Sequence, residues 1–124
     1  MKAARDARSI LIIEDDVDLA RLMQVQLIHE GFTAAVAIGG DQGMLDVEAS
    51  PPSAVVLDLR MEPTNGFDVL RQLRSGATTA KIPVIVTSVV DEAERRALAE
   101  GATAFIVKPY LPRKLADTLR SILD

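Results

Sequence analysis

The stretch 9–16 reads SILIIEDD, an apolar run that ends in three consecutive acidic residues. A short continuous run of branched apolar side chains is typical of a strand buried on both faces of a parallel sheet. Comparable runs recur along the chain, and an amphipathic stretch follows each of them. The five expected strands are Ser9–Ile13, Phe32–Ile38, Ala54–Leu57, Pro83–Thr87 and Ala104–Val107.

The stretches that follow these runs carry apolar residues at the spacing of an amphipathic helix. The expected helices cover residues 15–30, 41–49, 67–73, 91–100 and 111–123. In the second of them, Met44, Leu45 and Val47 are expected to face inward. Asp91 is expected to cap the fourth helix, with Glu94 as its return partner. Five repeats of strand then helix predict one α/β domain, a doubly wound sandwich with a parallel sheet between two helix layers.

The composition narrows the class of protein. The chain has 124 residues, a net charge of −4 and no cysteine, so disulfides and thiolate metal sites are excluded. We expect a flexible segment at residues 1–8 and the domain at 9–124. Neither a basic surface for nucleic acid nor a long apolar run for a membrane is present. A cytoplasmic protein without direct nucleic acid binding is therefore expected.

Polar side chains end four of the five expected strands. They are Glu14 and Asp15 after the first strand, Asp58 after the third, Thr87 and Ser88 at the end of the fourth, and Lys108 after the fifth. The carboxyl ends of parallel strands meet at one edge of the sheet, where ligands of doubly wound folds bind. Separately, each residue also fits an ordinary structural role, such as a helix cap or a solvated lysine. Together they predict a site at this edge.

The charges of this expected site favour a cation. Carboxylates about 4 Å apart repel by roughly 4 kcal/mol at an effective dielectric near 20. Mg²⁺ suits such a cluster, because it accepts carboxylate oxygens, keeps bound waters and takes phosphate oxygens. A carboxylate can also act as a nucleophile toward phosphorus and form an aspartyl phosphate. A lysine amine then pairs with the phosphoryl oxygens.

Five short motifs carry a resemblance that covers nearly the whole chain. They are ILIIEDD at 10–16, VVLDLRM at 55–61, NGF at 65–67, IPVIVTS at 82–88 and FIVKP at 105–109. In this order and spacing, the chain resembles the receiver domains of two-component response regulators. The resemblance implies a (βα)5 fold with the flavodoxin-like strand order 2-1-3-4-5.

The resemblance also implies roles for residues at the metal and acceptor positions. Asp58 matches the phosphoacceptor. Asp15 matches the acid that binds Mg²⁺ (or Mn²⁺) directly, and Glu14 matches its neighbour, which acts through water. Arg60, two residues beyond the acceptor, matches the position whose backbone carbonyl binds the metal. Asp16 is interpreted as a helix-start residue only.

Further roles follow for the switch positions of the family. Ser88 matches the hydroxyl residue that contacts the phosphoryl group, and strand phasing favours it over its neighbour Thr87. Lys108 matches the phosphate-binding lysine, and its bond to Pro109 is expected to be cis. Phe105 matches the aromatic switch position, although a plain core residue is the other interpretation.

The family resemblance implies partners and a mode of action. A sensor histidine kinase or a histidine phosphotransfer protein would donate the phosphoryl group. The receiver would catalyse this transfer and its own dephosphorylation without being a conventional enzyme. The surface of the last two helices and the fifth strand would then change and meet a downstream partner. A monomer or weak dimer is expected, and the sequence leaves open whether the domain stands alone.

Two departures from the family pattern stand out. The loop after Asp58 reads MEPTNG, with its proline one position later than usual, so an altered loop shape is expected. Residues 89–107 form a slightly shorter connection than in many relatives. The fourth helix or the loop before it is therefore expected to be short or displaced.

Three other functions fit parts of the pattern. A flavodoxin-like flavin binder would need a phosphate loop after the first strand, where Glu14 and Asp15 would repel phosphate. A haloacid-dehalogenase-type phosphatase would need a second acid at position 60, which is an arginine. A phosphate-independent pseudo-receiver remains, and the complete acceptor set argues against it.

Overall fold

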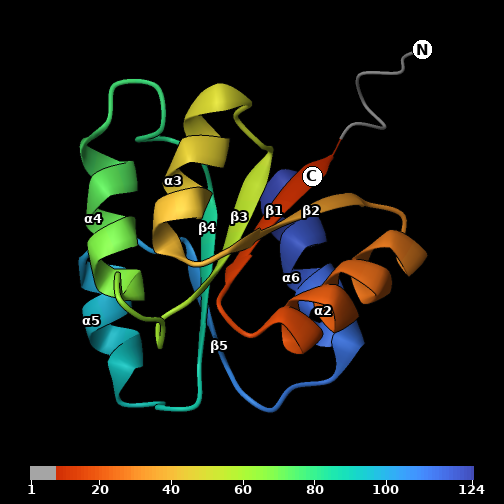
Figure 1. Ribbon diagram of the computed structural model, residues 1–124. Helices are drawn as coiled ribbons and strands as arrows, with labels where there is room; N and C mark the ends of the chain where they lie inside the picture. The colour runs from red at the N-terminus through yellow and green to blue at the C-terminus, as the bar shows by residue number, and fades with distance from the viewer. Residues whose placement is uncertain (1–7) are drawn as a thin grey trace.

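The computed structural model describes residues 8–124, which form a five-stranded parallel sheet between two helix layers (Figure 1). The strands lie in the order β2-β1-β3-β4-β5, so the predicted (βα)5 fold and its strand order are confirmed. The strands are β1 Ser9–Glu14, β2 Thr33–Ile38, β3 Ala54–Asp58, β4 Val84–Ser88 and β5 Ala104–Val107. Four lie within two residues of their predicted limits, and β5 matches at both ends.

Helices cover both faces of this sheet. They are α2 Val17–His29, α3 Gly40–Ala49, α4 Gly66–Ser75, α5 Ala93–Ala99 and α6 Pro112–Leu123. Figure 1 shows α3, α4 and α5 on one face, and α2 and α6 on the other. None of the helices in residues 8–124 is both long and apolar enough to cross a membrane.

Two apolar cores hold the helix layers to the sheet. Along β1, Ile10 and Ile12 enter the core beneath α2 and α6, whereas Leu11 and Ile13 enter the core beneath α3, α4 and α5. This alternation follows from the two-residue period of a strand. The two edge strands are the exceptions, because only Ala37 is buried along β2 and only Ile106 along β5. Full burial of the second and fifth strands on both faces was therefore wrongly predicted.

The helix ends and faces correct two further expectations. Asp16 caps α2, because its carboxylate accepts a hydrogen bond from the Leu19 amide at 3.0 Å. Asp91 does not cap α5 with its side chain: its backbone carbonyl accepts from the Glu94 amide, and α5 begins only at Ala93. With seven residues α5 is the shortest of these helices, as the short 89–107 connection suggested. Leu45 is 62% exposed, so its inward orientation was wrongly predicted.

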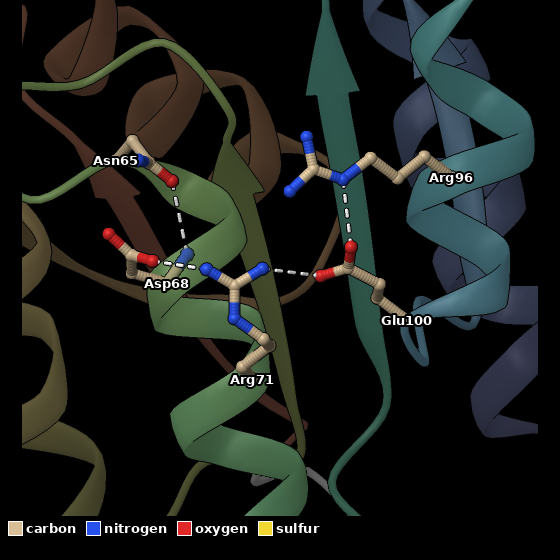
Figure 2. A network of polar contacts seen from close by, with 5 residues as sticks. All are labelled: Asn65, Asp68, Arg71, Arg96 and Glu100. Carbon is tan, nitrogen blue, oxygen red and sulfur yellow. Dashed lines mark hydrogen bonds and ion pairs between the residues drawn. The ribbon is translucent and has the colours of Figure 1, made fainter.

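A chain of polar contacts joins α4 to the C-terminal end of α5 (Figure 2). Asn65 caps α4 by accepting a hydrogen bond from the Asp68 amide at 3.1 Å. Arg71 pairs with Asp68 and, across the helix interface, with Glu100 at 2.8 Å. Arg96 also donates to Glu100 at 2.8 Å, and its guanidinium lies 3.8 Å from the centre of the Phe67 ring.

The predicted flexible segment 1–8 lies outside the described residues except for Arg8. The Arg8 carbonyl accepts a hydrogen bond from the Thr33 amide at 3.3 Å. Its guanidinium pairs with Asp124 and lies 5.8 Å from the centre of the Phe32 ring. The boundary at residue 9 therefore stays a prediction.

Candidate functional site: an acidic pocket at the carboxyl edge of the sheet

The candidate site lies where β1, β3, β4 and β5 end. Glu14 is the last residue of β1 and Asp58 the last residue of β3. Thr87 pairs in register with Asp58, and Ser88 with Val107, which places the end of β4 between β3 and β5. Lys108 follows β5 directly. The topology therefore brings the acids, hydroxyls and amine of the sequence together at one edge.

Three carboxylates form the acidic part of the site. One oxygen each from Glu14, Asp15 and Asp58 lies within 4.8 Å of the other two. Glu14 and Asp58 are 2% and 6% exposed, whereas Asp15 faces solvent. Two buried acids and an open third side suit a hard divalent ion that keeps part of its water shell. The donor set thus fits the predicted metal type.

Lys108 is the cation of the site. Its Nζ atom donates to Asp58 Oδ1 at 3.0 Å and to Glu14 Oε1 at 3.3 Å, and its side chain is 16% exposed. The peptide bond from Lys108 to Pro109 is cis. Beyond this ammonium, Glu14 Oε2 accepts a hydrogen bond from the Asp16 amide at 3.3 Å. One ammonium faces three carboxylates, which leaves the pocket with excess negative charge.

Burial and charge change the acidity of two groups in this pocket. The pKa of Glu14 is raised to about 7, first by burial and then by the negative charge of Asp58, while Lys108 opposes the rise. The pKa of Tyr110 is raised to about 12 by burial and by Glu14 and Asp58. A positive charge placed beside such a buried carboxyl stabilises its ionised form and lowers its pKa.

The two hydroxyls at the end of β4 lie on opposite faces of the sheet. Val86 pairs with Phe105, so Ser88, two residues later, lies on the same face as this aromatic ring. Phe105 is half-buried against the core beneath α3, α4 and α5. Ser88 is 1% exposed, and its Oγ accepts a hydrogen bond from the Val90 amide at 3.0 Å. Thr87 lies on the face of Asp58 and Ile106.

The loop from Leu59 to Asn65 closes back on the end of β3. Gly66 donates its amide to the Leu59 carbonyl at 2.9 Å, and a Cβ atom on Gly66 would lie 2.4 Å from the Asp58 carbonyl oxygen. A glycine is therefore required for this approach. The Glu62–Pro63 bond is cis.

Arg60 lies in this loop with an exposed side chain. It lines an open hollow beside the acids, together with Asp15 and Asn65. The predicted role of its backbone carbonyl as a metal ligand stays a prediction.

Sequence reasoning missed two residues of this region. Tyr110 approaches the acids closely enough for their charge to affect its pKa, although no sequence motif singled it out. Gly66 was noted only as part of the NGF motif. The asparagine-glycine pair at the start of α4 was the available signal for a tight approach of the backbone.

Comparison with known proteins identifies the family. The family model described as "Response regulator receiver domain" matches residues 10–120. The chain belongs to this family. Receiver domains of this family are components of response regulators, and two such regulators are among the similar sequences. Response regulator ArlR of Staphylococcus epidermidis is 32% identical over 117 residues, covering 93% of this chain and 52% of the relative.

A second relative agrees with this assignment, and two solved structures share the fold. DNA-binding response regulator MtrA of Mycolicibacterium paratuberculosis is 35% identical over 118 residues, covering 92% of this chain and 50% of the relative. The receiver chain thus spans about half the length of these relatives. A sensor protein from Polaromonas sp. JS666 superimposes with a TM-score of 0.88 at 28% identity, covering 94% of this chain and 95% of that one. CheY4 of Vibrio cholerae shares the fold with a TM-score of 0.87 at 21% identity, covering 94% and 99%.

Proposed function

We propose that this receiver domain accepts a phosphoryl group on Asp58 from a phosphohistidine, with Mg²⁺ or Mn²⁺ bound by the acids. One observation carries the proposal: a nearly buried carboxylate is held at 3.0 Å by the Lys108 ammonium, beside two further acids. This arrangement provides a nucleophile, a cation for phosphoryl oxygens and ligands for a metal in one place.

The transfer exchanges one bond to phosphorus for another. An Asp58 carboxylate oxygen attacks the phosphorus, the O–P bond forms and the bond from phosphorus to the histidine nitrogen breaks. The leaving imidazole nitrogen keeps the bonding electron pair and takes a proton from solvent. When bound, the divalent ion supplies positive charge that offsets the charge on the transferring group. Lys108 adds a second positive charge on the side of β5.

Glu14, Asp15 and the Arg60 carbonyl are the remaining proposed metal ligands, with Glu14 acting through water. Before phosphorylation the carboxylates of Glu14 and Asp58 also keep Lys108 in place, because a largely buried ammonium needs hydrogen-bond partners. Hydrolysis of the aspartyl phosphate by water then resets the domain. Both steps use the same residues, so the receiver catalyses its own phosphorylation and dephosphorylation.

The proposed switch begins at Ser88. In the proposed response, the Ser88 hydroxyl leaves the Val90 amide and donates to a phosphoryl oxygen. Phe105, on the same face of the sheet, moves inward into the space beside β4. The surface of α5, β5 and α6 changes as a result. The phosphoryl group acts by stabilising one of two existing conformations.

The proposed partners are protein partners. A sensor histidine kinase or a histidine phosphotransfer protein donates the phosphoryl group, and a downstream partner or effector domain reads the surface of α5, β5 and α6. Direct contact with nucleic acid or with a membrane is not part of the proposal. We propose a cytoplasmic location and a monomer or weak dimer.

Incubation with Mg²⁺ and acetyl phosphate tests the proposal. Mass spectrometry of the intact protein should show one added phosphoryl group, and Asp58→Asn should prevent it. Asp15→Asn should slow it strongly, because one metal ligand is lost. A gain that survives in Asp58→Asn, or no gain in the parent protein, contradicts the proposal. In the latter case the domain is a phosphate-independent interaction module.

A further inference from the structure

Thr87 carries a fully buried hydroxyl. The residue is 0% exposed, and its Oγ1 makes no hydrogen bond within residues 8–124. A buried polar group left in this condition costs about 1–3 kcal/mol. Valine would have nearly the same shape without this cost. The hydroxyl therefore needs an explanation, and its surroundings in the sheet supply one.

Thr87 lies on the face of the sheet that the Lys108 side chain crosses. Thr87 pairs with Asp58 on one side and with Ile106 on the other, so all three side chains lie on one face of the sheet. β4 separates β3 from β5. Lys108 starts after β5, yet its Nζ reaches Asp58 on β3 and Glu14 on β1. The lysine side chain must therefore pass over the end of β4, on the face that Thr87 occupies.

The ammonium of Lys108 has more donors than fixed acceptors. It carries three N–H groups, and the structure gives it two acceptors within the described residues, Glu14 Oε1 and Asp58 Oδ1. A metal ion on the acids and a phosphoryl group on Asp58 would engage these same oxygens. The ammonium then has to turn toward the phosphoryl group while its remaining N–H groups seek other acceptors. Thr87 Oγ1 is an unused acceptor on the path of this side chain.

We propose that Thr87 is a positioning residue: its hydroxyl accepts a hydrogen bond from Lys108 in the loaded site and aims the ammonium at the phosphoryl group. The inference rests on the proposed phosphorylation of Asp58 and adds a residue to it. Thr87 acts through Lys108 and does not replace Ser88, which lies on the opposite face of the sheet.

Beryllofluoride binding in saturating Mg²⁺ tests the role of Thr87, because this ion mimics the phosphoryl group on a carboxylate. Tyr110 provides the fluorescence readout, since it is the single tyrosine, lies near the acids and is accompanied by no tryptophan. Thr87→Val should weaken beryllofluoride binding by roughly 3- to 10-fold, the worth of one hydrogen bond. Thr87→Ser keeps the hydroxyl and should stay within about twofold of the parent.

Two further measurements separate positioning from packing. Thr87→Val should melt at an equal or higher temperature than the parent, because it removes an unpaired polar group. In a Lys108→Met background, where beryllofluoride binds more weakly, Thr87→Val should cause no additional loss. Equal beryllofluoride affinity of Thr87→Val and the parent overturns the inference, as does an undiminished loss in the Lys108→Met background. If the parent protein itself fails to bind beryllofluoride, the proposed function fails first.

Discussion

The two ends of the sheet bury charge in opposite ways. At the amino end, the Arg74 guanidinium donates to the carbonyls of Gly101, Ala80 and Ile82 at 2.8, 3.1 and 2.8 Å. It also lies 3.4 Å from the Thr103 hydroxyl. At the carboxyl end, three acids cluster around one ammonium, which pairs with two of them. The amino end holds one cation among neutral acceptors. The carboxyl end holds a cluster of anions with too few hydrogen-bond donors to neutralise them.

This difference separates a structural site from the site at which we propose phosphorylation. Burial lowers the pKa of Arg74, yet its hydrogen bonds join α4, the loop before β4 and the turn before β5 into one unit. Arg74 therefore needs no further partner to stay charged. At the other end the pKa of Glu14 is raised to about 7, so the ionised acids destabilise the fold unless a further cation binds beside them. The comparison predicts that mutations at the two ends change stability in opposite directions.

Arg74→Met gives the largest expected effect. It keeps a long apolar side chain but leaves three backbone carbonyls without their donor, so unfolding free energy should fall by about 2–3 kcal/mol. Urea denaturation without metal measures the loss. Arg71→Met is the matched control, because Arg71 is half-exposed on the same helix and makes only the surface pairs of Figure 2. Its loss should be much smaller. Equal losses would show that Arg74 is no special anchor.

Glu14→Gln should act in the opposite direction. The free carboxyl has an ordinary pKa near 4.5, and the folded value is about 7. The folded state therefore holds the Glu14 proton more tightly, and ionisation at higher pH destabilises it. Without metal at pH 8, Glu14→Gln should raise unfolding free energy by about 1–2 kcal/mol, after allowance for solvent screening.

The pH dependence of this gain identifies its cause. Below about pH 4.5 Glu14 is protonated in both the folded and the unfolded chain, so the variant and the parent should differ little. Between about pH 4.5 and 7 the parent should lose stability relative to Glu14→Gln, and above 7 the difference should be constant. A gain of equal size at pH 4 and pH 8 would mean that packing, and not charge, is responsible.

The apolar pattern predicted the fold well because it reports burial directly. Each strand was predicted from a short apolar run, and the runs of the three central strands, β1, β3 and β4, are buried on both faces. The prediction that Leu45 faces inward failed for a geometric reason. Met44 and Val47 lie on one side of a helix, whereas Leu45 lies about 100° around from Met44, so all three could not face inward. The prediction that the Asp91 side chain caps α5 failed because the chain forms a turn there, in which the Asp91 carbonyl accepts the hydrogen bond.

The site was predictable only as far as topology determines it. Glu14, Asp58 and Lys108 end parallel strands, and the sheet had to bring them together. The isolation of the Thr87 hydroxyl and the approach of Tyr110 to the acids depend on how neighbouring side chains pack. A linear sequence does not report that packing, so these two features came from the structure alone.

Mg²⁺ should stabilise the carboxyl end and leave the amino end unaffected. At a Mg²⁺ concentration ten times its Kd, unfolding free energy should rise by about 1.4 kcal/mol. Removal of the metal with EDTA should reverse the rise, and Asp58→Asn should reduce it. Arg74→Met, although less stable, should gain as much from Mg²⁺ as the parent. Thermal melts with and without Mg²⁺ test this, and an equal gain in Asp58→Asn would show that Mg²⁺ binds elsewhere.

The smallest expected effect is on the lifetime of the phosphoryl group, which depends on how easily water reaches the carboxyl end of the sheet. Val90 is 40% exposed, and its amide donates a hydrogen bond to the Ser88 hydroxyl two residues earlier. We expect its apolar side chain to hinder the water that would attack the proposed aspartyl phosphate. Val90→Glu should let that water approach and should orient it. The phosphoryl lifetime should then shorten by roughly 3-fold, which takes about half of the barrier change that gives a tenfold faster reaction.

Val89→Glu is the control: it adds the same charge one residue away, at a residue that is 53% exposed, and should change the lifetime less. Decay of the phosphoryl mass after removal of acetyl phosphate measures both. A lifetime in Val90→Glu that equals or exceeds the parent value would show that water reaches Asp58 by another path.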